Sequence, residues 1–135
     1  MALSNFSTDL SVVTVNGRRI QDWGDTTTPY TDAPIDAQSQ LRRGQGGSAI
    51  RLDRINPGRT VNLYVNPGSN DAAFLQGLYT SKANITLTYT QIGTLENAVG
   101  TEGVIVNDGQ RGRAGSTIND DQFIIEFNVW TASRG

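Results

Sequence analysis

The residues that could carry acid–base chemistry lie near the C-terminus and are Asp120, Asp121 and Glu126. Glycosidases use two carboxyl groups that face the same substrate bond. Asp120 and Asp121 are adjacent, however, and adjacent side chains of a strand point to opposite faces of its sheet. The exposed entry to a strand is therefore the better interpretation, and the sequence predicts no catalytic residue.

Metal and cofactor chemistry has as little support. Asp108, Asp120 and Asp121 do not have the spacing of a calcium-binding loop. The chain contains no histidine and no cysteine, so it lacks the commonest zinc and copper ligands, the usual general base and any thiol nucleophile. We expect no metal, no cofactor and no enzymatic activity.

Charge is unevenly distributed along the chain. The net charge of −2 and the pI of about 4.9 argue against a dedicated nucleic-acid-binding surface. An acidic stretch is followed by an arginine-rich one in which Asp53 is the only acidic residue. The acidic residues are Asp22, Asp25, Asp32 and Asp36, and the basic residues are Arg42, Arg43, Arg51, Arg54 and Arg59. This change of sign indicates either a contact between copies of the protein or two solvated surfaces of opposite charge.

The elements that position these residues fit into one domain. A chain of 135 residues can bury a core without metals or disulfides. No apolar stretch has the length of a membrane span, and residues 1–10 lack the basic and apolar regions of a secretion signal. We therefore expect a single domain at 1–135, made in the cytoplasm, with no membrane partner.

Most of the chain has the alternation of β-strands. Asn16-Gly17 stands between strands at Leu10–Val15 and Arg18–Trp23 and predicts a hairpin with a type I′ turn. Further strands are expected at Ala49–Ile55, Thr60–Val65, Asn84–Ile92, Gly103–Asn107 and Gln122–Thr131, the first two of which are predicted to be joined by the turn Asn56–Arg59. The last strand is expected to be central, and residues 107–116 to form a loop.

The segment Gly24–Gly47 is long, polar and poor in large apolar residues. Such segments inside a compact domain are usually functional, although flexibility is an alternative interpretation. We expect a weak strand at Thr27–Ile35, followed by an arm with a glycine-rich tip at Gly44–Gly47.

A single helix is predicted after the second Asn-Pro-Gly turn. Ser69 or Asn70 can cap its first turn, and Asp71 complements the helix dipole. An apolar stripe at helical spacing follows, formed by Phe74, Leu75, Leu78 and Tyr79. The helix is expected to end near Lys82 and to pack on a sheet.

Two segments, "VTVNGRRIQDWGD" at 13–25 and "VNLYVNPGSNDAAFLQGLYTSK" at 61–82, resemble the tail tube proteins of contractile-tailed bacteriophages. The resemblance extends over about Asp9–Trp130. It implies a mainly β fold, an antiparallel β-barrel or sandwich with one short flanking α-helix. It also implies stacked hexameric rings around a lumen for DNA and the tape-measure protein, inside a tail sheath in the virion, with an inter-subunit arm at about 24–48.

By the same analogy, Thr27–Gln40 lies partly on the lumen side. Asp32 and Asp36 are then candidate acidic lining residues, and Arg42 and Arg43 are candidate inter-ring contacts. DNA is expected to pass through the lumen without specific binding.

Two alternatives to this interpretation remain. Gln91–Ser116 is richer in glycine and more loop-like than expected for the family, which leaves a tube-end or baseplate component as an alternative. The second alternative is a carbohydrate-binding β-sandwich module, which needs exposed aromatic residues on one sheet face. The candidates, Trp23, Tyr30, Tyr64, Tyr89 and Trp130, are scattered in sequence.

Overall fold

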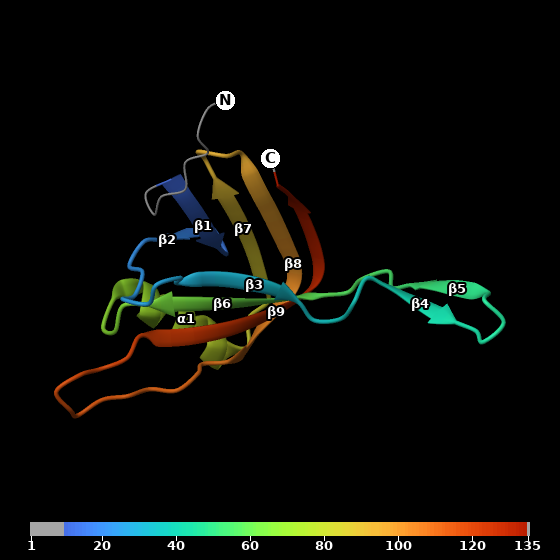
Figure 1. Cartoon of the computed structure of the whole chain (residues 1–135). Coiled ribbons are helices and arrows are strands. Elements are labelled where there is room, and N and C mark those ends of the chain that lie inside the picture. The colour runs from blue at the N-terminus through green and yellow to red at the C-terminus, as the bar shows by residue number, and fades with distance from the viewer. Residues whose placement is uncertain (1–9, 135) are drawn as a thin grey trace.

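The structure, a computed structural model, describes residues 10–134 of the chain. Within them, a seven-stranded antiparallel sheet of strand order β2-β1-β7-β8-β9-β6-β3 carries one helix, and a separate two-stranded hairpin, β4-β5, projects from it (Figure 1). The elements are β1 Ser11–Val15, β2 Arg18–Ile20, β3 Tyr30–Pro34, β4 Ser39–Arg43, β5 Ala49–Asp53, β6 Arg59–Val65, α1 Asn70–Ser81, β7 Ile85–Gln91, β8 Glu96–Asn107 and β9 Asp121–Ser133. No helix in this part of the chain is long and apolar enough to cross a membrane.

The predicted N-terminal hairpin is confirmed. Asn16 and Gly17 take the φ angles of 48° and 85° that a type I′ turn requires. The Asn16 side chain also accepts a hydrogen bond from the backbone amide of Thr86 at 2.8 Å and donates one to the carbonyl of Asn84 at 3.0 Å. The turn is thereby tied to the start of β7, which continues the sheet beyond β1.

The sheet curls strongly along the paired strands β8 and β9. The pairing of β7 with β8 shifts register at Ile85/Leu87, and Glu102 has a φ of 54° at this bulge. A Cβ atom at Gly103 would overlap the Phe127 ring, so a glycine is needed for that ring to pack. The curl brings Tyr30 of β3 onto Tyr89 of β7, with ring centroids 4.8 Å apart, although three strands, β8, β9 and β6, separate β7 from β3 in the sheet order.

The helix closes one side of the curled sheet. The Ser69 side chain accepts a hydrogen bond from the Ala72 amide at 3.2 Å, and Lys82 ends the helix with a φ of 56°. Both predicted ends are confirmed. The core is formed by one apolar face of the strands together with two helix residues and consists of Val13, Val15, Ile20, Val61, Leu63, Val65, Ala72, Leu75, Ile85, Leu87, Ile105, Phe123, Ile125 and Phe127.

Two predictions about pairing and length were wrong. Ala49–Asp53 does not pair with the strand that follows it. It pairs with β4, whereas β6 lies between β3 and β9. The reason is that β6 has an alternating apolar face that the core can bury, while every residue of β5 is exposed.

The projecting hairpin therefore covers 39–53 and includes β5, whereas Tyr30–Pro34, within the predicted arm at 24–48, is a strand of the main sheet. The glycine-rich region is also more regular than predicted. Glu96–Asn107 forms one long strand, because Gly100 and Gly103 make room for aromatic side chains instead of breaking the sheet. The loop follows at 108–120.

Candidate assembly surfaces

The hairpin β4-β5, which we call the arm, is exposed along its entire length. In the described part of the chain, its strands pair only with each other, and each of their residues is solvent-exposed. Leu41 is 65% exposed, Ile50 58% and Leu52 48%. An isolated two-stranded hairpin is only marginally stable in water. These aliphatic side chains are therefore available to pack against another molecule.

The two faces of the arm differ in chemistry. Directly opposed residues of an antiparallel pair share a face. The register places Gln40, Arg42, Ile50 and Leu52 on one side, the Arg42 face. The opposite side, the Arg43 face, consists of Ser39, Leu41, Arg43, Ala49, Arg51 and Asp53. Arg42 and Arg43 therefore point in opposite directions.

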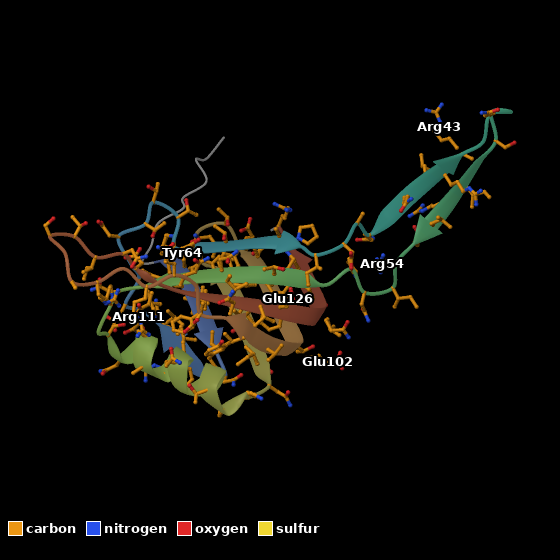
Figure 2. The ribbon with its side chains drawn as sticks, turned by 90° about the horizontal axis from the view of Figure 1, so that it is seen from below. Arg43, Arg54, Tyr64, Glu102, Arg111 and Glu126 are labelled. Carbon is orange, nitrogen blue, oxygen red and sulfur yellow. The ribbon has the colours of Figure 1, made fainter. Side chains whose placement is uncertain are left out.

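The root of the arm is formed by 35–38 and 54–58. The amides of Ile35 and Asp36 donate hydrogen bonds to the carbonyls of Gly58 and Pro57, at 3.3 and 3.1 Å. Asp36 and Arg54 approach to 3.8 Å, and both side chains are about half exposed. Figure 2 shows Arg54 at this root and Arg43 near the far end of the arm.

Asp32 lies in a different environment from Asp36. Its carboxylate forms an ion pair with Arg59, whose Nε lies 2.9 Å from Asp32 Oδ1, and both side chains are about four-fifths buried. The Arg59 guanidinium also lies 5.8 Å from the Trp130 ring centroid. Burial, with the nearby Asp32 carboxylate, raises the pKa of Tyr30 far above its ordinary value. The ion pair with Arg59 thus neutralises the charge of Asp32 within the subunit.

The outer face of the sheet next to the arm root carries apolar and acidic side chains together. Val104 is 41% exposed and Val106 44%. Glu126 lies directly opposite Val104 across the β8–β9 pair. We call the residues on this face Val104, Val106, Ile124, Glu126 and Glu102 the valine–glutamate patch. Among residues 10–134, neither glutamate forms an ion pair.

The outer face of the other half of the sheet is polar but uncharged over three strands. It follows β1, β7 and the first half of β8, and its side chains are Val12, Thr14, Thr86, Thr88, Thr90, Asn97 and Val99. Threonine is compatible with strands and remains wettable. On these three strands the threonine face carries no charge, whereas Arg19 of β2 lies directly opposite Thr14 at its edge, and Val99 is 43% exposed.

The carboxylates that sequence reasoning considered for catalysis have separate structural partners. Asp120 accepts hydrogen bonds from the amides of Asp25 and Thr26, at 3.0 and 2.9 Å, and from the Thr26 hydroxyl. Burial would raise the pKa of Asp120, but these hydrogen bonds outweigh it and hold the pKa below its usual range. Asp121 pairs with Arg113 at 2.7 Å. Within 10–134, no group of three or more acidic residues could hold a metal ion.

The hydrogen bonds that Asp120 accepts were not predicted, and neither was the buried position of Asp71. Asp71 begins the helix but is only 2% exposed. It accepts hydrogen bonds from Arg18 Nε at 2.8 Å and from the amides of Gln21 and Asp22 at 2.7 and 2.9 Å. Its neighbours in sequence contain no signal for these partners, which lie about fifty residues away.

No family model matches the chain, and no curated protein does. Solved structures do match. A chain of the sheath-tube complex of the extracellular contractile injection system PVC, in its extended state, has a TM-score of 0.62 at 12% identity, covering 97% of this chain and 93% of that one. The sheath/tube terminator of the same system has a TM-score of 0.60 at 13% identity, covering 98% and 99%.

The tube-terminating cap of the anti-feeding prophage matches with a TM-score of 0.57 at 15% identity, covering all of this chain and 95% of that one. This protein has the fold of contractile tail tube subunits. The predicted resemblance and the mainly β fold class with one helix are thereby confirmed. The three matching structures are described as a sheath-tube complex, a sheath/tube terminator and a tube-terminating cap.

Proposed function

We propose that this protein is a structural virion protein that forms the stacked hexameric rings of a bacteriophage contractile tail tube. In this proposal it is assembled in the host cytoplasm, surrounded by a tail sheath, and encloses a conduit for DNA and the tape-measure protein. The observation that carries the proposal is the projecting arm, whose exposed aliphatic side chains need a partner that the subunit itself does not supply.

The sheet edges support the same proposal. Within residues 10–134, β2 and β3 are the two edges of the seven-stranded sheet and leave backbone groups without a strand partner. A cyclic head-to-tail arrangement of copies would pair or cover such edges and close a ring. The matching sheath-tube complex supports a partnership with a sheath.

The structure supports the proposed roles of the candidate residues to different degrees. Arg43 lies near the far end of the arm, Arg42 precedes it in β4, and both are proposed as inter-ring contacts. Asp36 is half exposed and remains a candidate for the acidic lining of the lumen. Asp32 is proposed as a weaker lining residue, because Arg59 already neutralises its charge.

A tube-end role is the second candidate, since two of the matching structures are a tube terminator and a tube-terminating cap. The carbohydrate-binding alternative gains no support. Trp23, Tyr30, Tyr89 and Trp130 all pack against the core, so they do not form an exposed aromatic platform.

Electron microscopy of the purified protein by negative stain tests the proposal. Hollow rods are expected from a main tube subunit, and single rings or short stacks from a tube-end subunit. Monomers would contradict both roles. Replacing Arg42 and Arg43 together with glutamate should prevent stacking, whereas rods of normal length from R42E/R43E would refute the inter-ring assignment. K82E/R111E is the matched control, because it makes the same charge change at exposed sites on the body.

A further inference from the structure

The Arg42 face is the side of the arm that most needs a partner. Two of its four side chains, Ile50 and Leu52, are large, aliphatic and about half exposed. The third, Arg42, forms no ion pair within residues 10–134. The Arg43 face has one large aliphatic side chain, Leu41, and some of its polar groups are already paired, because Asp53 accepts hydrogen bonds from Arg51 and Ser39 at 2.8 and 2.7 Å. The Arg42 face thus exposes two aliphatic side chains and one arginine that have no partner within residues 10–134.

The valine–glutamate patch has the complementary chemistry. Val104 and Val106 are aliphatic and exposed, and Ile124 lies beside them on the same face. Glu126 faces Val104 directly. Glu102 accepts a hydrogen bond from Asn128 at 3.3 Å. An aliphatic pair with one arginine therefore matches an aliphatic pair flanked by carboxylates.

A subunit cannot satisfy this match by itself. Figure 2 places Glu102 and Glu126 at the end of the body from which the arm leaves, whereas Arg43, next to Arg42 in sequence, lies near the far end of the arm. The extended strands carry these arginines away from the subunit's own glutamates. The patch that receives an arm must therefore belong to another molecule.

The overall charges favour a second copy of this chain as that molecule. Residues 39–53 contain three arginines and one aspartate and carry a charge of +2, whereas the remaining residues carry −4. Arm and body of two copies attract each other, and two arms repel each other. The same chain supplies both halves of the contact, as an open head-to-tail interface requires.

We propose that the Arg42 face of each arm packs on the valine–glutamate patch of a second copy, with Ile50 and Leu52 against Val104 and Val106 and with Arg42 paired to Glu126. This inference rests on the proposed tube function and assigns the surface that receives the arm. Arg43, on the opposite face, does not take part in this ion pair.

A charge exchange tests the pairing. R42E alone and E126R alone should each weaken assembly at least about tenfold, because each places like charges together in the contact. Assembly is measured as the critical concentration for sedimentable rods, with rod structure checked by electron microscopy. The combination R42E/E126R restores opposite charges and should return the critical concentration to within about threefold of the unmodified protein.

Two further variants separate this pairing from general charge effects. R43E/E126R has the same net charge as R42E/E126R but should not restore assembly. R111E, at the loop end of the body shown in Figure 2, should assemble normally. Circular dichroism confirms that each variant is folded.

Failure of R42E/E126R to assemble, or equal rescue by R43E/E126R, would overturn the inference while leaving the tube function intact if the unmodified protein still forms rods. Monomeric unmodified protein would instead refute the proposed function.

Discussion

At the scale of single residues, Asp71 joins three parts of the structure. It belongs to α1, yet its carboxylate binds Arg18 of β2 and the backbone amides that follow β2. Burial acts to raise the pKa of Asp71, but the hydrogen bonds from Asp22, Gln21 and Arg18 outweigh burial and lower it below its ordinary value. The charged form is therefore the one that the folded subunit stabilises.

Replacing Asp71 with asparagine should lower the free energy of unfolding by roughly 2–3 kcal/mol, because a buried charged acceptor with three donors is lost. Urea denaturation at neutral pH measures the change, and the assembly-deficient R42E/R43E protein serves as the background. D25N is the matched control, because the Asp25 side chain is exposed. A similar loss in D25N would contradict the assigned role.

The lowered pKa also fixes the sign of the pH dependence. The contribution of Asp71 is complete at pH values above the unfolded-state pKa of about 3.9 and is lost as the pH falls through the lower folded-state pKa. The stability difference between the unmodified protein and D71N should therefore be largest at neutral pH and shrink in acid. A difference that grows in acid would contradict the assignment.

At the scale of the elements, the curl of the sheet depends on small residues of β8. Gly100 and Gly103 lie against the rings of Trp130 and Phe127 on β9. Without that space, the aromatic side chains could not lie between the two halves of the sheet. The curl in turn sets the direction in which the arm leaves β3 and β6.

Replacing Gly103 with alanine should destabilise the subunit by about 1–3 kcal/mol, because the added methyl overlaps the Phe127 ring in a packed core. Gly77 offers the matched control. It lies on the exposed side of α1 with open space around its Cβ position, so G77A should stabilise the helix by up to about 1 kcal/mol. Urea denaturation measures the free energy of unfolding of both variants. Equal destabilisation, or equal stabilisation, by G103A and G77A would contradict the packing argument.

At the scale of the whole molecule, the distribution of charge divides the chain into a basic arm and an acidic body. Residues 39–53 carry +2 and the remainder carries −4. The threonine face on β1, β7 and the first half of β8 belongs to this body but carries no charge on those strands. In the proposed tube, the basic arm of one copy would be attracted to the acidic body of another.

Raising the salt concentration from 0.1 to 1 M should increase the critical concentration for assembly, because the screening length falls from about 10 Å to about 3 Å. Light scattering at several protein concentrations measures the change. The urea midpoint of the R42E/R43E subunit is the control, since its buried core is largely insensitive to screening. Assembly that strengthens with salt would show that apolar contacts dominate over the arginine–glutamate pairs.

The local elements of this protein were predictable from sequence alone. Asn16-Gly17 determines the hairpin, and Ser69 and Lys82 bound the helix. Alternation predicts a strand at Asn84–Ile92, and the structure has it at Ile85–Gln91. Each of these signals acts over a few neighbouring residues. Charge and composition likewise excluded histidine and cysteine chemistry.

The choice of partners was decided only by the tertiary structure. Whether Ala49–Asp53 pairs with the strand before it or the strand after it depends on which strand the core can bury. Asp71 meets its donors, and Asp32 meets Arg59, only after segments distant in sequence have packed together. Local sequence signals report conformational preference, whereas burial and ion pairing depend on the three-dimensional neighbours that the assembled sheet supplies.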